Sequence, residues 1–401
     1  MTLTTRAPGR VPAVVLALLA APMALGMAAP PLVLPQAAGA LGLTLGVVTW
    51  VVTTFGWAIA VGTPLLAGVQ NRYGERAGLL VAGGLVLGGG LVTVTAPGLG
   101  SLLAGGALQG LGSAGFTTIA MSLAGSPRAL GLVTASLATV GATAPLAGEL
   151  IAGLLGWRAA LALPVLSLAV LPLALRRTPA TSPSRPPSPG VQGYGGRFDP
   201  GGAVALTGLV TALVFVPHAW HLAGGAAVLA ALLLALRLRT RPDGFVPVTV
   251  IRVPRFLAAS GLAFGLGVVN FGLLYALPGP LAAGTGWSGT AVGLAMTWPL
   301  LFGGLASYGV VAWTERLPFA LSAALLAGLA ATATVVALLG TAPPALLVAQ
   351  GLASVAAASG QGVLAGRART AVPEKDRPAA MGLFNLAYLL GTAFGPALVA
   401  G

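Results

Sequence analysis

The sequence predicts an all-α membrane protein that crosses the bilayer about thirteen times. Of 401 residues, 57% are hydrophobic and 7% are charged, which is too little polar surface for a soluble chain of this length. Many apolar runs reach the roughly 20 residues that a spanning helix needs, and the alternating pattern of outer-membrane strands is absent. Because backbone groups in lipid must form hydrogen bonds within the protein, these runs are expected to be helices.

The predicted spans follow one another with short connections. Their expected bounds are 11–34, 45–69, 77–97, 99–124, 129–156, 158–175, 201–217, 219–236, 256–281, 289–313, 317–340, 342–366 and 380–400. The first run follows Arg6 and Arg10 but has no small-residue cleavage site after a short core. We therefore expect a retained span and not a secretory signal peptide.

The basic residues support this topology. With the N-terminus in the cytoplasm, 19 of the 20 Lys and Arg residues fall in seven cytoplasmic segments, and only Arg158 falls outside. Cytoplasmic loops collect Lys and Arg in this way, so we expect a multi-pass protein of the cytoplasmic membrane. The spread of the positive charge predicts contact with anionic membrane lipids and argues against a nucleic-acid partner.

One polar stretch divides the chain. Residues 176–200 are rich in Pro, Ser and Gly, which is typical of a linker. We expect an N-terminal six-helix bundle over 1–175, this cytoplasmic linker, an extra two-helix hairpin over 201–238 and a C-terminal bundle over 239–401. Two helix bundles joined in this way are typical of secondary transporters.

Two stretches carry motifs. The first, LLAGVQNRYGERAGLL (65–80), lies between the second and third spans and combines Asn71, Arg72, Gly74 and Arg76. Its glycine permits a tight turn between two helices, and its basic groups can bond to helix ends.

The second motif lies in the fifth span. It reads GATAPLAGELIAGLLGWRAALALP over 141–164 and contains Gly141, Pro145, Gly148, Glu149 and Arg158. Small residues on one helix face predict close helix packing.

Together with ALQGLGSAG (107–115) and the segment 372–401, these stretches resemble the major facilitator superfamily, and within it the fourteen-span drug:proton antiporters. The resemblance implies a two-bundle fold whose C-terminal bundle lacks its last helix. Where that branch carries an acid in the first span and an arginine in the fourth, this chain has Gly26 and Gly106. Glu149 replaces the last glycine of the antiporter signature. The resemblance also implies that the face of this span around Glu149, with Pro145, Leu146, Ala152 and Gly153, meets the C-terminal bundle.

Energy coupling is expected to involve Glu149. The chain has no phosphate-binding G-x-x-x-x-G-K motif, so ATP-driven transport is not expected. Glu149 is the only carboxylate that we place in a span, and acids within the membrane are functional candidates. Two interpretations stay open: Glu149 with Arg158 serves proton coupling or gating, or Glu149 is a structural acid bonded to Arg158, to a polar group across the seam or to water.

A set of amides and aromatic residues forms the candidate substrate cavity: Gln109, Asn270, Tyr275, Asn385 and Tyr388. Such a lining suits a lipophilic ligand. We expect a monomeric secondary transporter, not an enzyme, that exports lipophilic drugs or metabolites in exchange for protons, without cofactor or metal. The alternatives are an exporter of one neutral metabolite without strict proton coupling, and a diverged membrane protein that does not transport.

Overall fold

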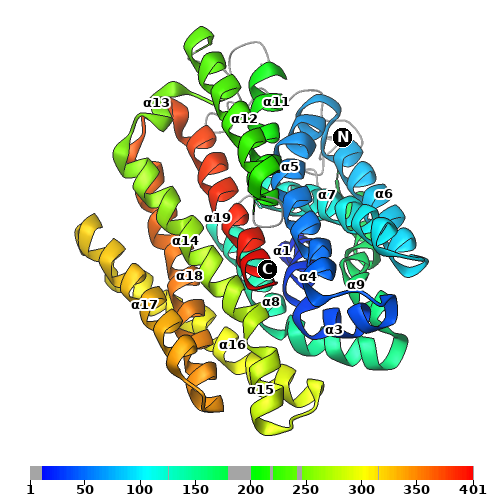
Figure 1. The fold of residues 1–401 in the computed structure, drawn as a ribbon. Coiled ribbons are helices and arrows are strands. Elements are labelled where there is room, and N and C mark those ends of the chain that lie inside the picture. Colours follow the sequence, from blue (N-terminus) through cyan, green and yellow to red (C-terminus); the bar gives the residue numbers. More distant parts are fainter. Residues whose placement is uncertain are drawn as a thin grey trace, which may run out of the picture.

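The computed structural model describes residues 11–124, 126–178, 200–216, 220–241, 246–314 and 316–400, apart from some side chains, that of Asn71 among them. Arg6, Arg10 and most of the predicted linker lie outside the described residues. The described residues form helices joined by short connections and contain no strand (Figure 1). The predicted all-α fold is therefore confirmed.

The N-terminal half contains the first six predicted spans. Its elements are α1 (Ala13–Ala20), α2 (Met23–Ala28), α3 (Pro30–Leu41), α4 (Leu45–Val48), α5 (Trp50–Tyr73), α6 (Glu75–Val94), α7 (Leu99–Leu123), α8 (Pro127–Leu155), α9 (Trp157–Leu161), the 3-10 helix η1 (Leu163–Ala169) and α10 (Leu171–Arg177). Gly74, with φ of 86°, forms the turn between α5 and α6 that the first motif predicts.

A hairpin and the C-terminal half follow. Their elements are α11 (Pro200–Phe215), α12 (Trp220–Thr240), α13 (Val248–Ile251), α14 (Pro254–Ala276), α15 (Pro278–Thr285), α16 (Gly289–Thr314), α17 (Phe319–Leu339), α18 (Pro343–Ala371), the 3-10 helix η2 (Glu374–Asp376) and α19 (Arg377–Ala400). The α11–α12 hairpin lies beside α5 and α19, as Figure 1 shows.

Not every predicted span is a single long helix. Within the described ranges, 9 helices are long and apolar enough to cross a membrane, and the bent first span would make up to 10. The other three predicted spans correspond to the Gly- and Ser-rich helix α7, the interrupted run from α9 to α10, and the short helix α11. The structure therefore establishes a multi-pass helical protein, and the count of thirteen stays a prediction.

The first span bends where two prolines meet. The axis turns by 53° between Ala13–Ala28 and Pro30–Leu41. Proline has no N–H, so Pro31 leaves the carbonyl of Met27, four residues earlier, without its helical donor. Beside the bend, a β-carbon on Gly26 would collide with the ring of Phe55 from α5. The resemblance assigns an acid to position 26, and the ring of Phe55 occupies the space that such a side chain would need.

The two halves pair their helices in the same order. In the N-terminal half, the first span packs on α8, and α5 and α6 pack on α7. In the C-terminal half, α14 packs on α19, and α16 and α17 pack on α18. The halves meet along a seam where α8 contacts α16 and α5 contacts α19.

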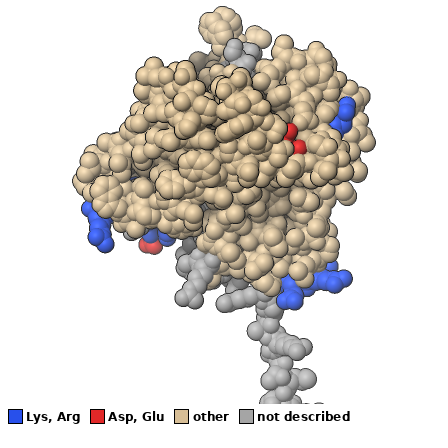
Figure 2. Space-filling view, turned by 90° about the horizontal axis from the view of Figure 1, so that it is seen from below, with Lys and Arg blue, Asp and Glu red and all other residues tan. Residues whose placement is uncertain are grey.

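Charge distinguishes the two ends of the helices. We call the end with Arg72, Arg76, Arg252 and Arg255 the basic end, and the opposite end the α15 end. Among the basic residues that the structure describes, only Arg158 follows a turn at the α15 end. Figure 2, the view from below Figure 1, shows a largely uncharged face with Lys and Arg at its rim.

Replacement of Gly26 by alanine tests the packing at the bend. We expect Gly26→Ala to lower the free energy of unfolding by about 1–3 kcal/mol, because the added methyl group overpacks against Phe55. Thermal unfolding in detergent measures the effect. Gly39→Ala is the matched control, because no atom lies within 4 Å of its added carbon. Recovery of stability in Gly26→Ala/Phe55→Leu is expected, and an unaffected Gly26→Ala variant would contradict this packing.

Candidate functional site

Glu149 lies where α8 meets α16. Its side chain is half-buried, and a β-carbon on Gly289, the first residue of α16, would collide with its carboxylate. The Nε2 of Gln36 in α3 donates a hydrogen bond to its Oε2 over 3.3 Å. The carboxylate of the N-terminal half therefore touches the first turn of a helix in the C-terminal half.

The start of α16 suits a negative charge. The Oγ of Ser288 accepts a hydrogen bond from the N–H of Ala291 over 3.3 Å, which caps this helix start. The first N–H groups of a helix and its dipole favour an anion there. The Glu149 carboxylate thus lies beside a helix start that attracts negative charge.

Arg158 has other partners. Its Nε donates to the carbonyl of Ala96 over 3.0 Å, and its guanidinium lies 4.1 Å from the ring centre of Trp157. In the described part of the chain, no ion pair or hydrogen bond joins Arg158 to Glu149. The interpretation that Glu149 is bonded to Arg158 does not hold in this structure, because the arginine ties the start of α9 to the end of α6.

The signature glycines face the first span, whereas the face of α8 that carries Leu146 and Glu149 meets α16 of the C-terminal half. A β-carbon on Gly148 would lie 2.8 Å from the β-carbon of Ala29, and one on Gly141 would lie 3.6 Å from that of Ala24. Pro145 lies inside α8 between them. Helix geometry separates the two faces, because positions 141 and 148 are two turns apart on one face and α8 turns another face to α16.

The small residues of the seam come from α16. A β-carbon on Gly293 would lie 3.0 Å from the Cα of Leu146, and Gly289 receives the Glu149 carboxylate. These glycines are four residues apart in GTAVG (289–293), a spacing that lets helices approach closely in membranes. Sequence reasoning missed this pair, although its spacing was the signal.

Tyr275 joins the halves at the bend of the first span. Its hydroxyl, on α14, donates to the carbonyl of Met27 over 2.7 Å. This is the carbonyl that Pro31 leaves without a helical donor. Tyr275 therefore satisfies the backbone of the opposite half, a role that competes with its predicted place in a substrate cavity.

Gln109 and Asn270, two of the predicted cavity amides, are each buried within their own half of the molecule. The Nε2 of Gln109 donates to Thr93 of α6 over 2.8 Å, and the Oδ1 of Asn270 accepts from Gln350 of α18 over 3.1 Å. The Oε1 atoms of Gln109 and Gln350 are buried without a hydrogen-bond partner. These contacts favour structural roles for Gln109 and Asn270.

The last two predicted cavity residues lie on α19. Tyr388 is buried in an apolar cluster with Phe256, Ala263 and Phe384. Asn385 is exposed and lies one turn from Leu389, which packs at the seam with Met27 and Phe55. Asn385 therefore continues the seam face of α19 towards the basic end.

The residues of the loop motif lie at the basic end, away from Glu149. Arg72 lies 5.4 Å from the ring centre of Tyr73, Arg76 lies in the first turn of α6, and the side chain of Asn71 lies outside the description. Within the described ranges, no group of three His, Asp or Glu side chains could hold a metal ion.

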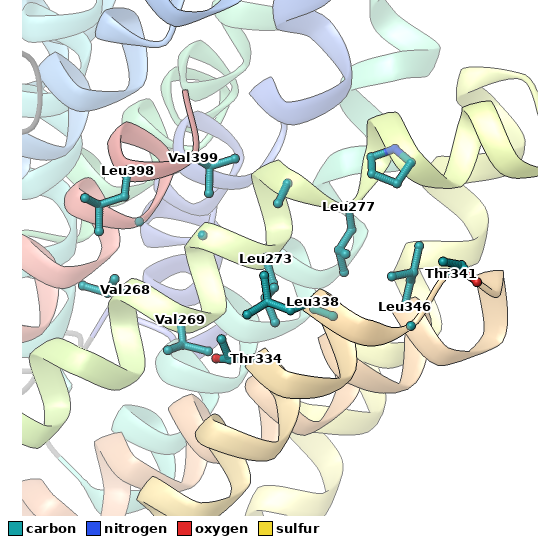
Figure 3. Close-up of a pocket in the computed structure, with 16 residues that line it drawn as sticks. Val268, Val269, Leu273, Leu277, Thr334, Leu338, Thr341, Leu346, Leu398 and Val399 are labelled. Atoms are coloured by element: carbon teal, nitrogen blue, oxygen red, sulfur yellow. The ribbon is translucent and has the colours of Figure 1, made fainter. Parts of the chain in front are cut away.

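A separate apolar groove lies within the C-terminal half (Figure 3). Its volume is about 590 Å³, and it is lined by α14, α17 and the end of α19, with Pro280 of α15 and Leu346 of α18. Its lining contains no predicted cavity residue and no charged side chain; Thr334 and Thr341 supply its hydroxyl groups. In the N-terminal half, α9, η1 and α10 fill the corresponding place beside α6 and the first span.

The comparisons with known proteins agree with this architecture. The sequence profile of the Major Facilitator Superfamily matches residues 14–270 and 256–401. The chain belongs to the Major Facilitator Superfamily. It is a multi-pass transporter and not an enzyme. No curated protein sequence matches significantly.

Solved structures share the superfamily fold at low sequence identity. The human organic anion transporter MFSD10 (TETRAN) is 19% identical with a TM-score of 0.63, covering 98% of this chain and 92% of its own. A mutant of the peptide transporter POT with alafosfalin is 16% identical with a TM-score of 0.64, covering 96% and 87%. The POT family transporter PepTSo is 16% identical with a TM-score of 0.62, covering 97% and 88%. These similarities establish the fold alone.

Replacement of Tyr275 by phenylalanine tests the bond across the seam. We expect Tyr275→Phe to lower the free energy of unfolding by about 0.6–2 kcal/mol, because the Met27 carbonyl loses its donor. Thermal unfolding in detergent is the measurement. Tyr308→Phe is the control, because Tyr308 is 67% exposed on α16. Equal stability of the two variants would show that the bond contributes nothing.

Proposed function

We propose that this superfamily member exports lipophilic drugs or metabolites across the cytoplasmic membrane by alternating access, with proton antiport as its energy source. The observation that carries the proposal is the Glu149 carboxylate at the start of α16. A titratable group at the contact between two moving halves can couple its protonation to their separation. The transporter fold supports the coarser part, and the substrate class and direction are our inference.

Protonation of Glu149 would act as a gate. The ionised carboxylate accepts from Gln36 and lies in the positive field of the α16 N-terminus. A protonated Glu149 loses this charge interaction, so the α8–α16 contact weakens and the α15 end opens more readily. With the predicted cytoplasmic N-terminus, the α15 end faces outwards, which is where an exporter must release its substrate.

Substrate contacts are proposed on the seam surface towards the basic end. Asn385 is exposed there and has an amide free for a ligand, and Phe271 borders the same apolar contacts at the seam. Asn270, Tyr388, Tyr275 and Gln109 are instead engaged in packing or in internal hydrogen bonds. One amide beside apolar side chains suits a lipophilic substrate.

Replacement of Glu149 by glutamine tests the gate. In vesicles with a pH gradient, we expect Glu149→Gln to change the transport rate about two- to fivefold, the range that corresponds to a helix-terminus charge interaction. The dependence of the rate on pH should weaken as well. Glu374→Gln is the control, because Glu374 is exposed and pairs with Arg377 over 3.2 Å. A Glu149→Gln variant with parental rate and pH dependence would remove Glu149 from the mechanism.

A second candidate function is export of one neutral metabolite without strict proton coupling. It is favoured by Gly26, because Phe55 fills the place where the antiporter branch carries its first-span acid. Proton flux in proteoliposomes, followed with a pH-sensitive dye, distinguishes the two candidates. Antiport predicts a proton movement that starts when substrate is added, and the second candidate predicts substrate movement without it. Absence of both transport and substrate-induced stabilisation would favour a diverged, non-transporting protein.

A further inference from the structure

The α11–α12 hairpin lies against both halves of the molecule. One face of α11 buries Val210 and Val214 against Ala60 and Val61 of α5 and against Leu390 of α19. Figure 1 shows the hairpin beside these two helices. The hairpin therefore covers the lateral line where the N-terminal half meets the C-terminal half.

The contacts of α11 with α5 include a polar bond. The Nε1 of Trp57 donates to the Oγ1 of Thr211 over 2.8 Å. About two turns away along α5, the ring of Trp50 stacks on that of Phe215 with 5.0 Å between centroids. Two separate points thus fix α11 to the N-terminal half.

The contact of α11 with α19 is apolar. Leu390 is its buried residue on α19, and Leu386 packs against the same cluster one turn away. Lipid tails are as apolar as these side chains, so separating such a contact in a bilayer costs little. An indole N–H that loses its partner in lipid finds no water to replace it.

The hydrogen bond between α11 and α5 is therefore expected to persist when the halves move, and the apolar contact between α11 and α19 is expected to give way. We propose that the α11–α12 hairpin is a side wall fixed to the N-terminal half, and that α19 slides along the Val210–Val214 face of α11 during the transport cycle. The wall keeps lipid out of the seam between α5 and α19 while the seam changes shape. This assignment rests on the proposed function for the rocking of the halves.

The wall also limits lateral exchange between the seam and the bilayer. A lipophilic molecule dissolved in the membrane meets α11 before it reaches the α5–α19 line. Val210 and Val214 are almost fully buried there, at 3% and 1% exposure, so their side chains close this part of the contact. Loosening of α11 from α5 would open the line to lipid.

Spin-label distances test the wall directly. The chain has no cysteine, so label pairs can be introduced into the natural sequence and measured in nanodiscs. One pair, at Leu65 and Gly208, joins α5 to α11, and the other, at Gly208 and Ala387, joins α11 to α19; Leu65 is 53% exposed. We expect a narrower distance distribution for the α5–α11 pair than for the α11–α19 pair at both pH 5 and pH 8. Equal widths, or a broader α5–α11 distribution, would overturn the proposal.

A matched pair of variants adds the chemical test. Thr211→Val removes the bond to Trp57, whereas Thr207→Val changes a half-buried threonine one turn away on the same helix. We expect Thr211→Val to broaden the α5–α11 distribution, and Thr207→Val to leave it unchanged. A Thr211→Val variant with the parental distribution would overturn the anchoring. These distances need no substrate, so a failure to find transport would count against the proposed function and not against the wall.

Discussion

The structure depends on one constraint, which is that backbone groups inside a bilayer must find hydrogen bonds within the protein. The first span violates the regular helix pattern, because Pro30 and Pro31 supply no N–H groups at its bend. The carbonyl of Met27 is then satisfied by the hydroxyl of Tyr275 in the opposite half. A local break in one helix is in this way converted into a specific bond between the two halves.

The same constraint determines which contacts hold the two halves together at the seam. Apolar side chains lose little when helices separate in lipid, so packing alone does not fix how the halves meet. Close approach and polar contacts do so instead, here through Gly289 and Gly293 of α16 and the carboxylate of Glu149. Tyr275 and Glu149 lie at separate points along this seam, and both involve the bent first span, through Met27 and Gln36. Movement of that span therefore affects both contacts together.

Much of the fold could be predicted from the sequence. Long apolar runs located the helices, and Gly74 located the turn between α5 and α6 because its positive φ favours glycine. The predictions were weaker where a span is not one apolar helix. Prolines at 164 and 172 interrupt the sixth span, and the many glycines of α7 lower its hydropathy.

The site was less predictable, because its partners are far apart in sequence. Gln36, Glu149 and Gly289 meet only after the halves have packed. No local pattern indicates that Glu149 lies against α16 and away from Arg158.

Local signals did exist for other contacts between and within the halves. The spacing of Gly289 and Gly293 marks a close helix contact, and the pattern Gln-Gly-Leu-x-Ser occurs at both 109–113 and 350–354. In each copy the glutamine is buried in its own half, which agrees with the matching helix order of the two halves.

The position of Glu149 favours gating over stoichiometric coupling. An antiporter must load its proton site from one side and empty it to the other, as the substrate site does. Glu149 lies six residues before the end of α8, about 9 Å from the α15 end. Between it and the basic end lies a buried apolar cluster that includes Leu25, Met296 and Leu300. Because this cluster separates Glu149 from the basic end, a proton that reaches Glu149 from the α15 end returns to that end. Glu149 can therefore set how often the α15 end opens without carrying a proton across the membrane. Proton antiport then needs a second titratable group that is reached from the basic end. Because Phe55 occupies the surroundings of Gly26, that group lies at another position than in the antiporter branch. Direct proton flux is therefore the observation that bears on coupling, and the effect of a Glu149 substitution bears on the gate.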